Sequence, residues 1–340
     1  MALNSLEEVA QAIVVKGKGI LAADESTPTI KKRFDTIGAE SSQDSRRSYR
    51  ELLFTTPGAE EFISGVILFD ETARQKGSDG TPLIEALSNK GIIPGIKVDK
   101  GAKALAGAPG EKVTEGLDGL RERLQEYRSM GCRFAKWRAV ITIGDGIPSH
   151  YCIQANAHAL ARYAALCVEQ DLVPIVEPEV LMDGPHSIEA CRQATRLSLH
   201  RTFSALLDQR VPLEKILLKP NMVLSGKECP VQAGVQEVAE ETVSCFRNVV
   251  PAAVPGVVFL SGGQSDVEAT AHLNAMNQMH GHPWHLSFSY GRALQAPALQ
   301  AWQGKSENGP QTQQALYKRA RFNGLATRGE YSAEMEQAVA

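Results

Sequence analysis

The chain has 340 residues, of which 43% are hydrophobic, and its formal net charge is −3. This composition suffices for a sizeable core, and it excludes the broad positive field that proteins use to bind nucleic acid or anionic membranes. Any positive charge that binds phosphate must therefore be local.

The cysteine content and the N-terminus favour an intracellular protein. Six cysteines are scattered without a C-x-x-C pair, which in a chain of this length is typical of reduced thiols rather than of a disulfide framework. The N-terminal segment has early acidic residues and no long apolar run, so we expect neither a secretion signal nor a transit peptide. No stretch approaches the ~20 apolar residues that span a bilayer. We therefore expect a cytoplasmic protein.

The first predicted element is a helix that begins at a capping box. Ser5 and Glu8 have the S-x-x-E spacing in which each residue satisfies a free backbone N–H near the other. Apolar residues then recur at helical spacing. Gly17 and Gly19 follow, and we predict that they end the helix.

Eight short apolar runs follow this helix, and most of the gaps between them have helical patterns. The runs begin at residues 19, 65, 95, 134, 173, 216, 256 and 285. Near-continuous apolar strands that alternate with helices are typical of buried parallel sheets. Eight such units predict a closed (β/α)8 barrel. An open doubly wound sheet is the alternative, although no G-x-G-x-x-G follows the first strand.

We expect one domain over residues 1–340. No repeat, low-complexity tract or composition break marks a second domain. The barrel core is predicted at about 18–305, and a polar helix with a tail at about 306–340.

Charged residues gather where the predicted strands end, which is where barrel enzymes place their catalytic groups. The set comprises Asp24, Lys97, Lys136, Arg138, Glu177, Glu179 and Lys219. Lys136 and Arg138 lie two residues apart in one predicted strand, and so do Glu177 and Glu179 in the next. The side chains of each pair therefore share a face of their strand. A single lysine at such a place usually reaches water, and a single carboxylate often caps a helix. Burying the whole set without mutual pairing would be costly, so we predict that these side chains form one site.

Lys219 is the candidate nucleophile because it follows the apolar run "ILL". A lysine attacks only as the neutral amine, whereas a free lysine has a pKa of about 10.4. Apolar burial and a nearby cation, which Lys136 could supply, favour the neutral amine. Such an amine forms a Schiff base with a carbonyl, and the iminium promotes bond cleavage beside it. Glu177 or Glu179 could then move protons, with Asp24 orienting the groups.

Two segments suggest phosphate sites on either side of this lysine. The turns "FLSGGQS" and "SYGRA" follow the seventh and eighth strands, where barrels often bind phosphate. A basic cluster, "ESTPTIKKRF", follows the first strand. A plain turn and a solvated run of charges are the alternatives. The candidates are Ser261, Gly262, Gly263, Ser289, Gly291 and Arg292 in the turns, and Ser26, Thr29, Lys31, Lys32 and Arg33 in the cluster. Together they would suit a bisphosphorylated sugar.

Several long motifs resemble the signatures of class I fructose-bisphosphate aldolase. They are, in the order of that family, "ILAADEST", "GIKVDKG", "FAKWR", "PIVEPE", "LLKPNM", "FLSGGQS" and "FSYGRALQ", and "YKRARFNG" extends the similarity. The resemblance implies a (β/α)8 barrel, usually a homotetramer, that uses no metal and no other cofactor. It also implies reversible cleavage of fructose 1,6-bisphosphate to dihydroxyacetone phosphate and glyceraldehyde 3-phosphate in glycolysis and gluconeogenesis.

The resemblance also implies roles for individual residues. Lys219 resembles the Schiff-base lysine, Glu177 the general acid/base that acts on the carbinolamine and the C4 hydroxyl, and Lys136 and Asp24 their charged partners. Glu179, Lys97 and Arg138 resemble substrate-contacting or supporting groups. The 1-phosphate cradle corresponds to Ser261, Gly262, Ser289, Gly291 and Arg292. The region near the other phosphate corresponds to Ser26, Thr29, Lys32, Arg33 and Lys97.

The chain departs from the animal members at two places. Pro28 and Thr29 stand where those members typically have Gly-Ser, and proline stiffens the loop. The chain also lacks the C-terminal tyrosine that helps to exchange the proton on the enamine carbon; its last tyrosine is Tyr331. That step could use Tyr331, a carboxylate or water. The preference between fructose 1,6-bisphosphate and fructose 1-phosphate stays open.

Other functions remain as alternatives. His280, His282 and His285 in "HGHPWH" could belong to a metal-dependent aldolase, although a histidine-rich surface loop is the simpler interpretation. A phosphosugar-binding scaffold without catalysis is a second alternative. Transaldolase-like and deoxyribose-phosphate aldolase-like barrels share the Schiff-base chemistry but not the long motifs.

Overall fold

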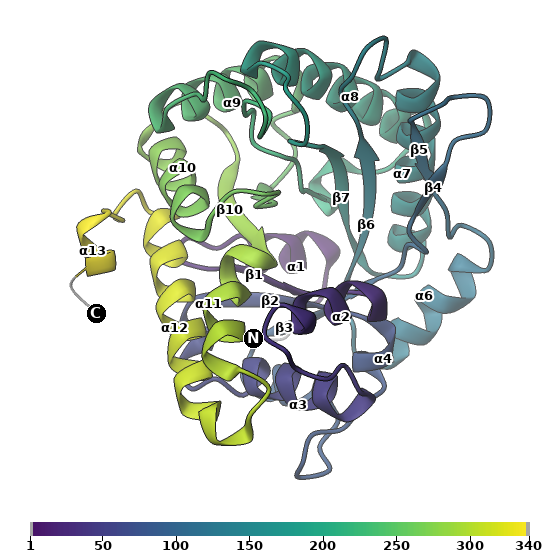
Figure 1. Ribbon diagram of the computed structural model, residues 1–340. Helices are drawn as coiled ribbons and strands as arrows, with labels where there is room; N and C mark the ends of the chain where they lie inside the picture. The colour runs from purple at the N-terminus through teal and green to yellow at the C-terminus, as the bar shows by residue number, and fades with distance from the viewer. Residues whose placement is uncertain (1–2, 338–340) are drawn as a thin grey trace.

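The computed structural model describes residues 3–337, and its centre is a closed barrel of eight parallel strands (Figure 1). The barrel strands are β1 (Gly19–Ala23), β2 (Ile63–Leu68), β3 (Ile93–Lys97), β6 (Phe134–Ile141), β7 (Val173–Val180), β8 (Leu217–Leu218), β9 (Gly256–Phe259) and β10 (His285–Tyr290). Strand β10 pairs with β1, which closes the barrel. The predicted (β/α)8 barrel is confirmed, and the open doubly wound sheet is wrong because no barrel strand is left as an edge.

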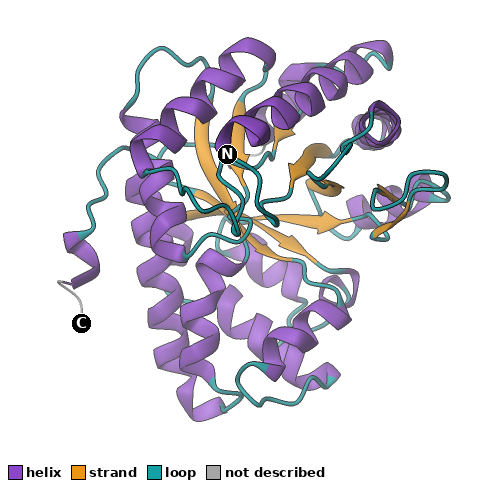
Figure 2. Ribbon diagram, turned by 45° about the horizontal axis from the view of Figure 1, so that its top comes forward, coloured by secondary structure: helices purple, strands orange, loops and turns teal. Residues whose placement is uncertain are grey.

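The helices lie outside the barrel wall, and most of them surround it as an outer layer (Figure 2). They are α1 (Leu6–Ile13), α2 (Thr27–Asp35), α3 (Gln43–Phe54), α4 (Asp70–Ala73), α5 (Leu83–Asn89), α6 (Leu120–Ser129), α7 (His150–Glu169), α8 (Ile188–Asp208), α9 (Val235–Val249), α10 (Asp266–Gln278), α11 (Arg292–Trp302), α12 (Gly309–Ala326) and α13 (Glu334–Gln337). Short 3-10 turns lie at η1 (Ala59–Glu61), η2 (Leu213–Lys215) and η3 (Ser306–Asn308). Among the described residues, no helix is both long enough and apolar enough to cross a bilayer.

The sequence pattern missed a small antiparallel pair that lies outside the barrel. Strands β4 (Ala102–Ala104) and β5 (Lys112–Thr114) form it after β3. Each has only three residues, and β4 is exposed throughout, so neither produces the apolar run by which the barrel strands were recognised.

Helix α1 closes the N-terminal end of the barrel. The predicted capping box is confirmed, because the Ser5 hydroxyl accepts from the Glu8 backbone N–H at 3.2 Å and Glu8 accepts from that of Ser5. The buried face of α1 joins the apolar residues of the barrel interior, including Phe134 and Leu217. The helix ends at Ile13, earlier than predicted, and Gly19 is already part of β1. With this end packed, a cavity can open only at the opposite mouth.

The strand register places the charged residues side by side. In β6, Trp137 is fully buried and stacks on Tyr163 of α7 with ring centroids 5.6 Å apart. Its neighbours on either side in the strand must point the other way, into the barrel. Arg138 pairs with Glu177 of β7, and Lys97 of β3 pairs with Lys136. Three adjacent strands therefore deliver their polar ends to one mouth.

The C-terminal segment packs on the outside of the barrel. Helix α12 lies against α10 and α11, and α13 follows beyond it (Figure 1). The predicted helix and tail are thus present, except that residues 338–340 lie outside the described residues.

Candidate active site

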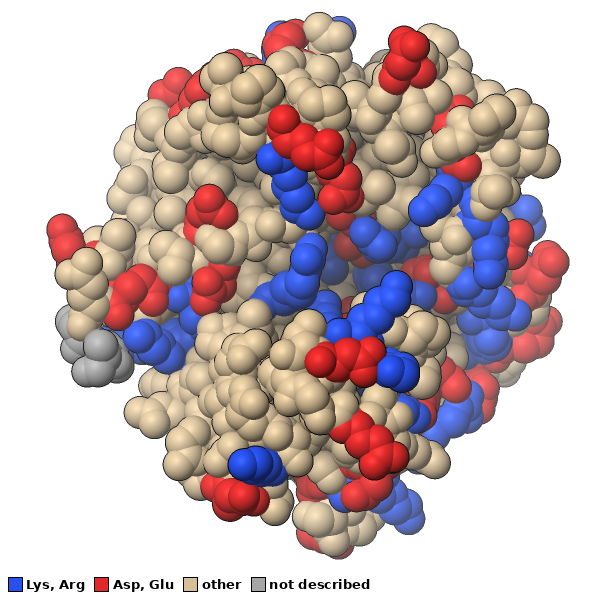
Figure 3. Space-filling view, in the orientation of Figure 1, with Lys and Arg blue, Asp and Glu red and all other residues tan. Residues whose placement is uncertain are grey.

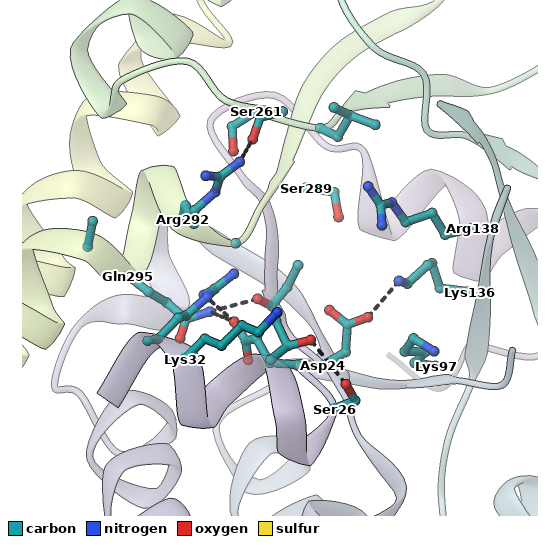
Figure 4. A pocket seen from close by; sticks show the side chains of 18 of the residues that line it. Asp24, Ser26, Lys32, Lys97, Lys136, Arg138, Ser261, Ser289, Arg292 and Gln295 are labelled. Atoms are coloured by element: carbon teal, nitrogen blue, oxygen red, sulfur yellow. Dashed lines mark hydrogen bonds and ion pairs between the residues drawn. The ribbon is translucent and has the colours of Figure 1, made fainter. Parts of the chain in front are cut away.

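A cavity of about 530 Å³ opens at the C-terminal ends of the barrel strands. Lys and Arg side chains gather in the hollow at this mouth (Figure 3), and Figure 4 shows many of the lining side chains pointing into it. The sequence-predicted residues that line it are Asp24, Ser26, Thr29, Lys32, Arg33, Lys97, Lys136, Arg138, Glu177, Glu179, Lys219, Ser261, Gly262, Ser289, Gly291 and Arg292. Residues from the first to the last barrel strand thus share one cavity.

Gly263 and Lys31 are predicted site residues that do not line this cavity. The Gly263 backbone N–H donates to the Met182 sulfur at 2.9 Å, and a Cβ at this position would collide with Lys227. Lys31 pairs with Asp35 on the exposed face of α2 at 2.8 Å. Both were grouped with the site because they are close in sequence to residues that do line it.

Four buried charges form the centre of the cavity. The Lys219 Nζ lies 3.3 Å from one oxygen of Glu177, and the Lys136 Nζ lies 3.4 Å from the other. Lys136 also contacts an Asp24 oxygen at 2.6 Å, as the dashed line in Figure 4 shows. Both lysines and Glu177 are no more than 4% exposed. Glu177 therefore lies between two amines and can exchange a proton with either.

Mutual attraction outweighs burial at this centre. Burial disfavours the carboxylate of Asp24, but Lys136 and then Lys219 outweigh it and hold the pKa of Asp24 well below its ordinary value. Burial likewise disfavours the ammonium of Lys136, but Asp24 and Glu177 raise the pKa of Lys136 above its ordinary value. Asp24 and Lys136 are therefore a charged pair at neutral pH.

The backbone after β8 explains why an apolar run ends on a lysine. The Lys219 N–H continues the strand ladder by donating to the Val176 carbonyl at 2.8 Å. Pro220 follows and has no N–H to donate. The Asn221 side chain then accepts from the Val180 N–H at 2.9 Å. Lys219 is thus fixed at the last rung, with its apolar stem in the barrel and its amine at the mouth.

Two further cations are held by carboxylates at the rim. Lys97 contacts an Asp99 side-chain oxygen at 2.5 Å and the Asp99 carbonyl at 2.9 Å. Arg138 pairs with Glu179. Burial opposes the charge on Arg138, but Glu179 outweighs it and raises the pKa of the guanidinium. Each cation is therefore already oriented before a ligand arrives.

One end of the cavity has the features of an anion cradle. The Ser289 hydroxyl is buried and has no hydrogen-bond partner among the described residues. Gly291 precedes α11, and a Cβ there would lie 3.4 Å from the Ala22 carbonyl and 3.6 Å from Arg33. Arg292 opens α11 and donates to the Gly262 carbonyl. A helix N-terminus, an unpaired hydroxyl and a guanidinium thus converge, as phosphate recognition requires.

The other end is formed by the start of α2. The Ser26 and Thr29 hydroxyls lie 3.1 Å apart, and Pro28 occupies the first turn of the helix, where its missing N–H costs nothing. Ser26 is the N-cap of α2, so Asp24, which could have capped it, is free to pair with Lys136. Lys32 is exposed at the rim.

Sequence reasoning missed Glu25 and Gln295, which also line the cavity. One Glu25 oxygen accepts from Arg33 and from the Gln295 amide, the latter at 2.8 Å. Gln295 also donates to the Ala22 carbonyl at 2.8 Å. Both residues lie inside quoted motifs, "ILAADEST" and "FSYGRALQ", but 270 residues separate them, and no local pattern pairs them.

The histidine cluster His280, His282 and His285 and the residue Tyr331 do not line the cavity. His285 is the first residue of β10, so it lies at the opposite end of the barrel. Among residues 3–337, no three His, Cys, Asp or Glu side chains are arranged to hold a metal ion. Tyr331 is buried on the outer helical layer, where its hydroxyl donates to Glu336 at 3.0 Å and its ring packs near Phe322.

Comparison with known proteins gives a consistent result. Residues 5–340 match the model of a family described as "Glycolytic: Fructose-bisphosphate aldolase class-I". A relative from Xanthomonas campestris, "Probable fructose-bisphosphate aldolase class 1", is 60% identical over 97% of this chain and 99% of its own length. "Fructose-bisphosphate aldolase" from Plasmodium falciparum is 54% identical over 96% of this chain and 89% of its own. The solved structure of the Plasmodium falciparum enzyme, in complex with TRAP and a small-molecule inhibitor, superposes with a TM-score of 0.95, 54% identity and coverage of 96% and 95% of the two chains.

Proposed function

Because this chain belongs to the class I fructose-bisphosphate aldolase family, we propose that it reversibly cleaves fructose 1,6-bisphosphate through a Schiff base on Lys219. The products are dihydroxyacetone phosphate and glyceraldehyde 3-phosphate. The observation that carries this proposal is the buried Lys219 amine 3.3 Å from Glu177, in a cavity with cationic groups at both ends.

The first half of the reaction forms the iminium. The neutral Lys219 amine attacks the C2 ketone, and the carbinolamine loses its hydroxyl as water. Glu177 is placed to give that hydroxyl a proton, because it lies within 3.4 Å of both Lys219 and Lys136. Asp24 keeps Lys136 charged, and this ammonium group lies on the other side of Glu177 from the nucleophile.

The second half breaks the C3–C4 bond. A base takes the C4 hydroxyl proton, glyceraldehyde 3-phosphate leaves as the aldehyde, and the bonding electrons move into the iminium to give an enamine. Glu177 is our choice for this base, with Glu179 as a supporting group held by Arg138. Protonation of C3 and hydrolysis then release dihydroxyacetone phosphate and restore the amine. Because Tyr331 does not line the cavity, a cavity carboxylate or water is the better candidate for the C3 proton.

The two ends of the cavity would hold the two phosphates. Ser261, Gly262, Ser289, Gly291 and Arg292 would take the 1-phosphate, and this assignment rests on the unpaired Ser289 hydroxyl and the start of α11. The other phosphate would lie towards Ser26, Thr29, Lys32, Arg33 and Lys97. A substrate spanning both ends would bring its C2 carbon to the central lysine.

The test is borohydride reduction in the presence of dihydroxyacetone phosphate, followed by peptide mapping. We expect a stable adduct on Lys219, none in Lys219→Met, and loss of turnover in that variant while its melting temperature stays within a few degrees of the wild type. Labelling at another lysine would reject the assignment. Loss of activity in EDTA without any trapped adduct would favour a metal-dependent reaction instead.

We also propose that the protein acts in glycolysis as a cytoplasmic homotetramer whose chain forms a single domain, with the boundaries given above. The family resemblance supports the tetramer. The described cysteines are all free, which agrees with a reducing compartment. Light scattering after gel filtration measures the mass of the assembly directly.

A further inference from the structure

A buried histidine on α10 is connected to the turn that follows β9. The ring Nδ1 of His272 lies 2.6 Å from the Gln264 side-chain oxygen. The Gln264 side-chain nitrogen donates to the Ser261 carbonyl at 3.1 Å, and the Gln264 backbone N–H donates to the same carbonyl at 3.0 Å. His272 and Gln264 are both buried, and neither has a role in the proposed chemistry.

The Ser261 carbonyl fixes the direction of every hydrogen bond in this chain. A backbone carbonyl can only accept, so the Gln264 nitrogen must face it and the Gln264 oxygen must face His272. That oxygen can only accept as well, so His272 must carry a proton on Nδ1. The histidine tautomer is therefore set by the backbone of the turn.

Three contacts hold the turn of residues 261–264, and they leave the backbone N–H groups of its first two residues free. Gln264 binds the Ser261 carbonyl, Arg292 donates to the Gly262 carbonyl, and Met182 accepts from the Gly263 N–H. Among the described residues, the backbone N–H groups of Ser261 and Gly262 have no acceptor. Both residues line the cavity. Gly262 has a φ of +58°, a conformation that glycine adopts without strain.

We propose that His272 is a positioning residue for the turn of residues 261–264. Through Gln264 it fixes the Ser261 carbonyl, so that the Ser261 and Gly262 N–H groups face the cavity and bind the 1-phosphate. This inference rests on the proposed function, because it assigns the support of that same subsite. It predicts an effect on ligands that carry the phosphate and none on ligands that lack it.

The surroundings of His272 keep this arrangement constant across the physiological range. Burial lowers the pKa of His272 to about 4, and Glu268 only partly opposes this. Glu268 is itself engaged at the start of α10, where it accepts from the Ser265 N–H and hydroxyl, both at 2.9 Å. Gln264 is neutral, so no other charged group is bonded to the ring. The imidazole is therefore uncharged near neutral pH, with its single proton directed at Gln264.

The test compares three substitutions that differ in where they offer a donor. His272→Leu removes it, His272→Asn places an amide N–H near the position of Nδ1, and His272→Gln places it nearer to that of Nε2. Each variant is trapped with borohydride over a concentration series of dihydroxyacetone phosphate and, in parallel, of dihydroxyacetone, which has no phosphate. Because the two ketones are compared on the same sample, loss of folded protein cancels from the ratio. Melting temperatures check folding independently.

We expect His272→Leu and His272→Gln to raise the half-saturating concentration of dihydroxyacetone phosphate about tenfold, the size of effect expected when a buried polar partner is left unpaired. In His272→Asn the half-saturating concentration of dihydroxyacetone phosphate should stay within about twofold of the wild type. Trapping of dihydroxyacetone should be unchanged in all three variants. If His272→Leu does not fold, the Asn and Gln variants carry the comparison.

Three results would overturn the inference. The first is an unchanged half-saturating concentration of dihydroxyacetone phosphate in His272→Leu or His272→Gln. The second is an equal shift of this concentration for dihydroxyacetone phosphate and dihydroxyacetone, and the third is the same value for dihydroxyacetone phosphate in the Asn and Gln variants. A wild-type protein that traps neither ketone would instead reject the proposed function, and the inference would fall with it. Trapping by the wild type without a selective change in the variants would reject the inference alone.

Discussion

Replacing Lys136 by methionine tests the charged centre of the site most directly. The side chains are similar in length, so the change removes the charge with little change in volume. Asp24, which is 9% exposed, loses the amine at 2.6 Å and has no other ion pair among the described residues. Glu177 keeps Lys219 at 3.3 Å. Because mainly one buried carboxylate is left unpaired, we expect the free energy of unfolding to fall by about 3 kcal/mol at pH 7, which is the lower end of the range for broken buried ion pairs.

The pH dependence of this loss has a definite sign. In the wild type the folded-state pKa of Asp24 is lowered, so its contribution to stability is present above the ordinary carboxyl pKa and is lost as the pH falls through and below it. In Lys136→Met only burial and the more distant lysines act, so the folded-state pKa of Asp24 rises. The difference in stability should therefore be largest at neutral pH and should shrink as the pH falls towards about 4.

Urea unfolding at several pH values, followed by tryptophan fluorescence, measures this difference. The control is Lys136→Met combined with Asp24→Asn, which removes the unpaired charge and should recover most of the lost stability at pH 7. It should not recover turnover, which we expect Lys136→Met to abolish because the ammonium group beside Glu177 is gone. Equal stability of Lys136→Met and the wild type at pH 7, or a gap that does not change with pH, would show that Asp24 is not held as a buried charge by Lys136.

Three further predictions concern residues around this centre. Glu25→Gln removes the ion pair that holds Arg33, so KM for fructose 1,6-bisphosphate should rise several-fold with kcat little changed; a steady-state assay that shows the reverse would contradict this. Because the pKa of His272 is lowered to about 4 on folding, the unfolded chain binds more protons than the folded chain between pH 6.5 and 4. The free energy of unfolding of the wild type, measured with urea, should therefore fall by up to about 3 kcal/mol over that window, and His272→Asn should not show this fall. Tyr331→Phe should exchange the C3 hydrogen of dihydroxyacetone phosphate with deuterated water at the wild-type rate, whereas a drop of tenfold or more would mean that Tyr331, now bonded to Glu336, reaches the cavity during turnover.

Some of the site could be predicted from local sequence because the residues concerned lie on strands. A β-strand fixes which residues share a face, so the spacing of two residues between Lys136 and Arg138, and between Glu177 and Glu179, was enough to place each pair on one side. Loops and turns have no such periodicity. Gly263 was therefore assigned to the cavity with its neighbours, whereas its backbone faces Met182.

The amino-acid sequence by itself determined the barrel and the identity of the chemical groups at its mouth, because the hydrophobic periodicity of eight strands and the polar residues at their ends are local properties. Only the tertiary structure decided which group contacts which. Glu25 meets Gln295 because closing the barrel brings β1 and β10 side by side, and Gly262 meets Arg292 because β9 and β10 are neighbours in the barrel; no local spacing specifies either contact. The tertiary structure likewise decided the place of Tyr331: its packing near Phe322 and its bond to Glu336 put it on the outer layer and away from the cavity, which its position near the chain end does not specify.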